Sequence, residues 1–265
     1  MTVLTLGAAR AGVEMRQFWR ERDAVVFTFA LPAVLLTLLG SLFSGVYDGS
    51  TVTSAQYLVP SMIAAGVAST TFVNLGIGIA TDRDDGTLKR LRGLPMPPVA
   101  YLIGKILLVV AVTLAEVVLL VAIGVLLFDL DLPTSPARWL TFAWVFLLGT
   151  VACSLLGVAA SALARSARSA AAVMNLPYVV LGFVSGIYYT PVGALPDWVI
   201  NLGSVFPLKW MAQGFRSAFL PDTILPQEVV PSWEHGRTAL VLAAWCIGGL
   251  VLCLTTFRWR GRQTS

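Results

Sequence analysis

The run "YLIGKILLVVAVTLAEVVLLVAIGVLLF" occupies residues 101–128, and Lys105 and Glu116 are its only charged side chains. A helix needs about 20 mostly apolar residues to cross the hydrocarbon core of a bilayer. The run is long enough for one crossing and contains few polar groups. It therefore predicts a transmembrane helix.

The composition of the whole chain agrees with a membrane location. Of the 265 residues, 57% are hydrophobic and only 12% are charged, whereas soluble domains carry about 25% charged residues. The three cysteines lie within apolar runs without metal-ligand spacing, so neither a disulfide nor a metal site is predicted. His235 is the single histidine, which argues against histidine-based metal sites and charge-relay catalysis.

Six segments in all satisfy the length and apolarity of a membrane span, which predicts an all-α membrane protein. The domain organisation expected is an amphipathic helix within 1–23, a six-span domain over 24–257 and a tail over 258–265. Only residues 165–169 separate the fourth and fifth spans, so a missing break there would leave five. The predicted spans are 24–46, 57–80, 101–128, 139–164, 170–188 and 237–257.

The placement of lysine and arginine predicts the orientation. With six spans, 14 of the 18 basic residues fall on the side of the N-terminus, and four (Arg138, Lys209, Arg216 and Arg237) fall on the other side. Basic residues favour the cytoplasmic side of a membrane, so both termini are expected in the cytoplasm. The net charge of +4 then reflects topology and contact with anionic lipid, and no nucleic-acid partner is needed to explain it.

Two further segments are expected at the membrane surfaces. Residues 10–23 form an amphipathic pattern in which Val13 and Phe18 enter the headgroup layer while arginines face phosphate. The alternative is a solvated basic leader. The long connection over 189–236 contains apolar stretches too short to span. They indicate short helices that pack at the outer surface or dip into the bilayer where protein covers their backbone.

A charged island, "ATDRDDGTLKRLRGLPMPPVAYLIGK", covers residues 80–105 between the second and third spans. Acidic residues precede basic ones, as the helix dipole favours, and leucines recur at three-residue spacing from Leu88 to Leu94. Gly93 and Pro95 end the pattern, which predicts a short amphipathic helix over 82–94. An apolar stripe exposed to cytosol needs lipid or a protein groove. The alternative is a basic anchor that only fixes topology.

Two stretches resemble a known family. "DRDDGTLKRLRGLPMPPVAYLIGKIL" (82–107) resembles the cytoplasmic loop of ABC-2 type transporter permeases, and "VFPLKWMAQGFRSAF" (205–219) resembles the segment before their last span. The similarity is greatest to the bacterial drug-resistance type. It implies a bacterial plasma-membrane protein that forms a 2+2 assembly, in which a second permease copy or homologue and two ABC ATPase subunits join this chain.

The same resemblance implies which residues contact the ATPase. Residues 10–23 would correspond to the family's connecting helix, and the 82–94 helix would enter a cleft of the ATPase. The coupling residues implied are Arg83, Thr87, Leu88, Lys89, Arg90, Leu91 and Arg92.

The chain has no G-x-x-x-x-G-K-[ST] phosphate loop, because Lys105 is followed by Ile106 and no glycine lies five positions before Gly104. No cofactor is therefore predicted in this chain, and ATP and Mg²⁺ are expected on the partner ATPase. A membrane enzyme is disfavoured because no paired acids or Ser–His pair lie at membrane depth.

Polar residues within spans suggest a substrate path. In the resembled family the second and fifth spans line the central path, along which an amphipathic drug, lipid or glycolipid-like substrate would move outward. For each residue the alternative is a hydrogen bond between helices. Glu116 is a charged group at membrane depth. The alternative function is therefore an ion-coupled secondary transporter that uses Glu116. The path residues proposed are Phe72, Asn74, Glu116, Asn175, Tyr178 and Phe183.

Overall fold

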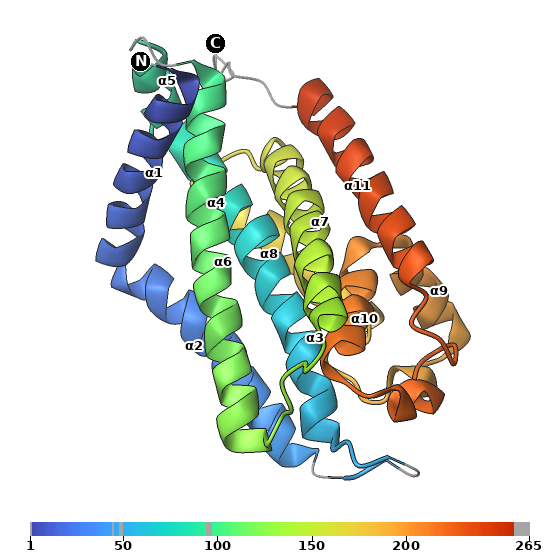
Figure 1. Cartoon of the computed structure of the whole chain (residues 1–265). Helices are drawn as coiled ribbons and strands as arrows, with labels where there is room; N and C mark the ends of the chain where they lie inside the picture. The colour runs from blue at the N-terminus through green and yellow to red at the C-terminus, as the bar shows by residue number, and fades with distance from the viewer. Residues whose placement is uncertain (1, 44, 48–49, 94–96, 257–265) are drawn as a thin grey trace.

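The computed structural model describes residues 2–43, 45–47, 50–93 and 97–256, and within these ranges the regular elements are helices beside one isolated bridge between Val46 and Thr53. The beginning of α1 and the end of α11 lie at one end of the bundle, which we call the terminal end (Figure 1). The helices are α1 (Val3–Arg20), α2 (Arg22–Leu42), α3 (Ser54–Ala68), η1 (Ser69–Asn74), α4 (Leu75–Asp84), α5 (Thr87–Arg92), α6 (Pro98–Phe128), α7 (Pro136–Ser161), α8 (Ala167–Val184), η2 (Val192–Ala194), α9 (Asp197–Val205), α10 (Pro207–Phe219), η3 (Asp222–Gln227) and α11 (His235–Thr256).

Within the described residues, six helices are long and apolar enough to cross a membrane, which confirms the six predicted spans. The break between the fourth and fifth spans is present, because the side chain of Ser166 caps the start of α8 and forms a reciprocal capping box with Ser169. The predicted tail over 258–265 lies outside the described residues. The observed spans are Arg22–Leu42, Ser54–Asp84, Val99–Phe128, Pro136–Ser161, Ala167–Val184 and His235–Thr256.

The second span is not a uniform α-helix. Its middle, η1, is a π-helix that joins α3 to α4. The wider turn brings the backbone carbonyl of Phe72 so close to Gly157 of α7 that a Cβ there would lie 2.7 Å from that oxygen. π-Helical turns are rare and are found mostly at functional sites, so this part of the span is of interest.

The first two helices form an elbow at Glu21, which ends α1 and precedes α2. Helix α1 starts earlier than expected, at Val3, and packs along α6 (Figure 1). Gly7 permits this approach, since a Cβ at that position would lie 2.5 Å from the side chain of Ile103. One face of α1 therefore contacts protein, and Arg10 pairs with Glu14 rather than facing phosphate as predicted.

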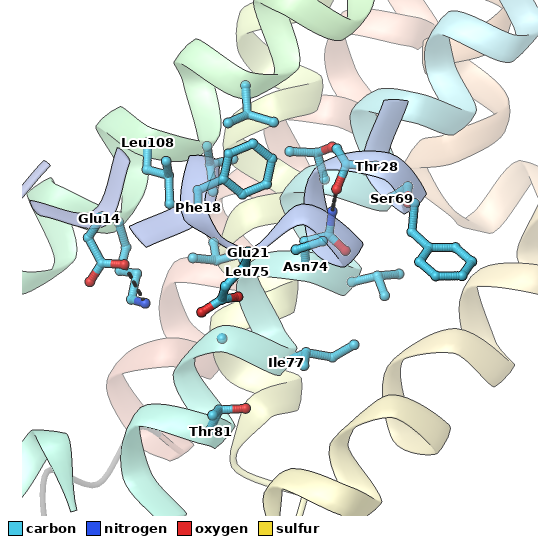
Figure 2. A pocket seen from close by; sticks show the side chains of 18 of the residues that line it. Glu14, Phe18, Glu21, Thr28, Ser69, Asn74, Leu75, Ile77, Thr81 and Leu108 are labelled. Carbon is cyan, nitrogen blue, oxygen red and sulfur yellow. Dashed lines mark hydrogen bonds and ion pairs between the residues drawn. The ribbon is translucent and has the colours of Figure 1, made fainter. Parts of the chain in front are cut away.

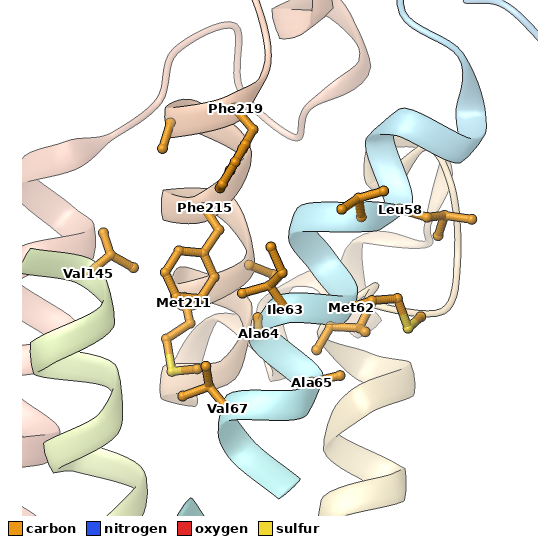
Figure 3. Packing of buried hydrophobic residues seen from close by; sticks show 14 of the residues in the cluster. Leu58, Met62, Ile63, Ala64, Ala65, Val67, Val145, Met211, Phe215 and Phe219 are labelled. Carbon is orange, nitrogen blue, oxygen red and sulfur yellow. The ribbon is translucent and has the colours of Figure 1, made fainter. Parts of the chain in front are cut away.

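Helix α10 occupies the core of the bundle, between α3, α7 and α11. All of its residues are buried, and Met211, Phe215 and Phe219 pack against α3 and α7 (Figure 3). The start of α10 lies beside the middle of α11. Val205, which closely precedes α10, accepts a hydrogen bond at 2.7 Å from the indole nitrogen of Trp245, near the middle of α11. The connection over 189–236 thus returns into the bundle at α10, where protein covers its backbone.

Candidate functional site

A cavity of about 480 Å³ opens at the elbow between α1 and α2. Its wall is completed by the π-helix and by α4 and α6 (Figure 2). Asn175 of α8 also lines it. We call it the elbow cavity. Its volume lies within the roughly 300–1,000 Å³ that is usual for sites of drug-sized ligands.

Asn74 and Asn175, two of the residues proposed for the substrate path, line this cavity. The Nδ2 atom of Asn74 donates to the hydroxyl of Thr28 at 3.1 Å, and that of Asn175 donates to the carbonyl of Ala171 at 2.9 Å. The first bond links the second span to the first, whereas the second stays within α8. Neither amide oxygen receives a hydrogen bond in the described part of the chain, so both oxygens are free to accept one from a ligand.

A buried cluster of charges closes the cavity toward the terminal end. The Nζ atom of Lys105 lies 2.9 Å from Glu14 and 2.7 Å from Asp82. Arg10 also pairs with Glu14, and the hydroxyl of Tyr101 donates to Asp82 at 2.7 Å. The cluster links α1, α4 and α6. Sequence analysis missed it because its members are separated by up to 91 positions.

The other predicted path residues do not line the elbow cavity. Phe72 and Tyr178 border a separate, smaller hollow of about 40 Å³ beside the start of α10. Phe183 is 60% exposed and contacts the ring of Tyr188. The six predicted residues are therefore distributed over several places instead of forming one surface.

Glu116 lies behind the cavity, in the middle of α6, and is 1% exposed. Its Oε2 atom accepts a hydrogen bond from Thr70 of the π-helix at 2.7 Å. Its Oε1 atom has no partner among the described residues and lies against Gly66, where a Cβ would be 2.5 Å away. The carboxyl group therefore links the third span to the π-helix of the second.

The predicted helix over 82–94 is shorter than expected. Helix α4 continues through Asp84, Gly86 turns the chain with a φ of 78°, and α5 begins at Thr87. Partial burial acts to raise the pKa of Asp85, but hydrogen bonds from the amide and hydroxyl of Thr87 outweigh it and hold the pKa below its ordinary value. Asp85 thus stabilises the start of α5, and Leu94 and Pro95 lie outside the described residues.

The predicted coupling residues fall into two groups. Leu88 and Leu91 are buried against Tyr101 of α6, so the leucine stripe faces this chain rather than the cytosol. Lys89 and Arg90 are exposed on α5, and Thr87 lies at its start. The side chain of Arg92 lies outside the described part of the structure.

Arg83 has a contact within the chain. Its guanidinium donates to the carbonyls of Ser161 and Ala164 at 2.9 and 2.5 Å. The carbonyl of Ser161 lies at the end of α7, where the last turn of a helix leaves its acceptors unsatisfied, and Ala164 lies in the connection to α8. Arg83 therefore links the end of the second span to the end of the fourth.

A second buried ion pair lies toward the opposite end of the bundle. The guanidinium of Arg216 on α10 binds both oxygens of Glu228 at 2.5 and 2.9 Å. Tyr57 donates to the same carboxylate at 2.8 Å, and Ser61 accepts from Arg216 at 3.0 Å. The pair fixes α10 to α3. Arg216 belongs to the motif at 205–219, but nothing in the sequence pattern identified Glu228 as its partner.

Comparison with known proteins gives consistent matches. A family model described as "ABC-2 type transporter" matches residues 11–220. "Putative transport permease YvfS" of Bacillus subtilis (strain 168) is 23% identical over 201 residues, which is 76% of this chain and 80% of that protein. "Probable multidrug ABC transporter permease YbhR" of Escherichia coli (strain K12) is 25% identical over 188 residues. The match covers 71% of this chain and about half (49%) of that relative.

Proposed function

Because the chain belongs to the ABC-2 type transporter family, we propose that it is the permease subunit of an exporter driven by a separate ABC ATPase subunit. The observation that supports this most directly is the position of α5. The helix presents Lys89 and Arg90 outward at the terminal end, and its other face is fixed to α6. Such a helix is suited to receive a movement from a partner and to transmit it to the spans.

The contacts around α5 give the movement a route. Leu88 and Leu91 pack on Tyr101 at the base of α6, and a short turn joins α5 to α4. Arg83 at the end of α4 holds the end of α7. A displacement of α5 would therefore reach the second, third and fourth spans together, in the manner of a rigid-body switch.

The orientation and assembly follow from the same proposal. The terminal end faces the cytoplasm of a bacterium, and the spans lie in its plasma membrane, as the distribution of basic residues indicates. Two permease chains and two ATPase subunits make the transporter. ATP and Mg²⁺ bind to the ATPase subunits. The substrate is an amphipathic drug, lipid or glycolipid-like compound that enters through the elbow cavity and leaves on the other side.

The coupling role is tested by charge reversal on α5. The tagged chain is purified from its native host, and co-purifying proteins that contain a P-loop ATPase sequence are quantified by mass spectrometry. We expect Lys89→Glu with Arg90→Glu to reduce the recovered ATPase by about tenfold or more, since complementary charges become repulsive. The matched control is Arg165→Glu with Arg168→Glu, two exposed arginines of which one precedes α8 and the other lies in its first turn.

The control should retain both the ATPase and export. If the α5 variant recovers as much ATPase as the control and exports at the same rate, the docking role of α5 is wrong. If no P-loop ATPase accompanies even the unaltered chain, the proposal of a separate ATPase subunit fails.

A second candidate function rests on Glu116. A buried carboxyl group with one free oxygen at the middle of a span is the kind of group that proton-coupled transporters use. Glu116→Gln separates this candidate from the ATP-driven exporter, because it removes the titratable group and keeps a hydrogen-bond acceptor.

A further inference from the structure

We propose that the elbow cavity binds an amphipathic organic amine and that Glu21 is the counter-ion of its ammonium group. The inference rests on the proposed export function and names the class of substrate that this site takes. Of the drug, lipid and glycolipid-like compounds considered above, it selects those with an apolar body and one positive charge.

The hydrogen-bonding groups of the lining favour a donor as ligand. The side-chain nitrogens of Asn74, Lys105 and Asn175 already donate to acceptors of the chain itself. The oxygens of Asn74 and Asn175 receive no donor within the described ranges. Gln17 is exposed at the rim of the cavity. Its amide nitrogen donates to no acceptor in the described ranges, but its amide oxygen is equally free, so Gln17 offers a ligand one donor group and one acceptor. Among its amide and charged side chains, the lining therefore offers more acceptors than donors to a ligand.

The charges of the lining favour a single positive charge. Glu14 and Asp82 are balanced by Arg10 and Lys105, with which they form buried ion pairs. Glu21 also lines the cavity, and among the described residues no lysine or arginine pairs with it. An anionic headgroup would face this carboxylate, and the cation of the described lining, Lys105, is already paired. An ammonium group would instead pair with Glu21.

Glu21 lies where a ligand can reach it. The residue forms the elbow between α1 and α2, and its carboxylate is among the groups drawn around the cavity (Figure 2). Its sequence neighbours Arg20 and Arg22 are exposed and are not part of the lining. The negative charge of Glu21 is therefore presented on the cavity side of the elbow.

The rest of the wall suits the apolar part of such a compound. Two aromatic rings, Phe18 and Phe27, line the side formed by the elbow, and Leu31, Leu108 and Val112 continue the apolar surface. Aromatic faces attract cations as well as apolar groups. An amine with an aromatic or alkyl body would thus bury that body against the wall while its ammonium group remains at Glu21.

The proposal is tested with dansylcadaverine, a fluorescent primary amine, and with its neutral N-acetyl derivative. Dissociation constants are measured by dansyl fluorescence on the full chain in nanodiscs of zwitterionic lipid. We expect the amine to bind more tightly than the neutral derivative. Glu21→Gln should weaken amine binding by about fivefold, the usual effect of one partly exposed charge pair, and leave binding of the derivative unchanged. Asp23→Asn removes an exposed acid outside the lining and should change neither constant.

A second variant locates the probe. Ala24→Trp fills part of the cavity, since Ala24 lines it, and should weaken binding of both probes. Equal affinity of the amine for the unaltered chain and for Glu21→Gln would overturn the proposal, and so would binding that Ala24→Trp leaves unchanged. Tighter binding of the anionic probe dansyl-glycine than of the amine would also overturn it. Each of these results can occur while the chain still binds its ATPase, so they are distinct from failure of the proposed function.

Discussion

The Nζ atom of Lys105 lies 2.7 Å from the carboxylate of Asp82 and thereby links the start of the third span to the end of the second. The same ammonium lies 2.9 Å from Glu14 of α1. One side chain thus holds together three helices at the terminal end. The side chains involved are 5–16% exposed, so water compensates little for their charges.

Removing Lys105 should therefore destabilise the chain strongly. Lys105→Met leaves two buried carboxylates with fewer partners, and breaking a buried charge pair costs about 3–5 kcal/mol. Lys89→Met removes a lysine from the exposed face of α5 and is the control, with an expected change within about 0.5 kcal/mol. The measurement is the melting temperature of the purified chain in detergent. Equal melting temperatures of the two variants would contradict the role of Lys105.

The Arg216–Glu228 pair should be equally important at the opposite end. Arg216 is fully buried, so Arg216→Met leaves Glu228 without its bidentate partner and should cost about 3–5 kcal/mol. The chain offers a surface pair for comparison, Arg237 with Glu234, whose arginine side chain is 70% exposed. Arg237→Met should change the stability by less than about 1 kcal/mol. Chemical denaturation in micelles measures both, and a smaller effect at Arg216 than at Arg237 would refute the prediction.

The contact between Gly157 and the π-helix predicts a steric effect. Gly157→Ala would place Cβ 2.7 Å from the carbonyl oxygen of Phe72, and since backbone cannot rotate away, overpacking should cost about 1–3 kcal/mol. Gly248→Ala on α11 meets nothing within 4 Å and should be neutral or stabilising by up to about 1 kcal/mol, as alanine favours helix. Thermal unfolding of the two variants tests the difference, and equal stability would show that the π-helix tolerates the added group.

How far the sequence predicted this structure depended on the range of the interactions. Apolar run length is a local property, and it located all six spans. The break between the fourth and fifth spans was predicted at residues 165–169 and lies slightly earlier, between Ser161 and Ala167. The leucine stripe of α5 was also recognised, but its direction was not, because Tyr101, which covers it, belongs to another helix. Sequence spacing gives the faces of a helix and does not give the neighbour that each face meets.

The buried charges were the least predictable part. Nothing in the sequence indicated that Glu14 and Arg216 are buried, because charged side chains are rarely buried without a partner. Their partners, Lys105 and Glu228, lie on other elements and become neighbours only in the folded chain. In the same way Asn74 and Asn175 were predicted to share a path, but their common cavity depends on the elbow after α1, which no local pattern indicated.

Glu116→Gln tests the source of energy for transport. Its side-chain oxygen can still accept the hydrogen bond that Thr70 now donates to Glu116 at 2.7 Å, so the π-helix should keep its place. We expect export by the ATP-driven transporter to stay within about twofold of the unaltered rate, because the variant costs less than about 1 kcal/mol. Glu116→Leu removes the acceptor and leaves the Thr70 hydroxyl unsatisfied, which should lower stability by about 1–3 kcal/mol. Vesicles that contain both subunits are assayed with and without ATP. Loss of export in Glu116→Gln at an unchanged melting temperature would contradict the structural role and favour proton-coupled transport.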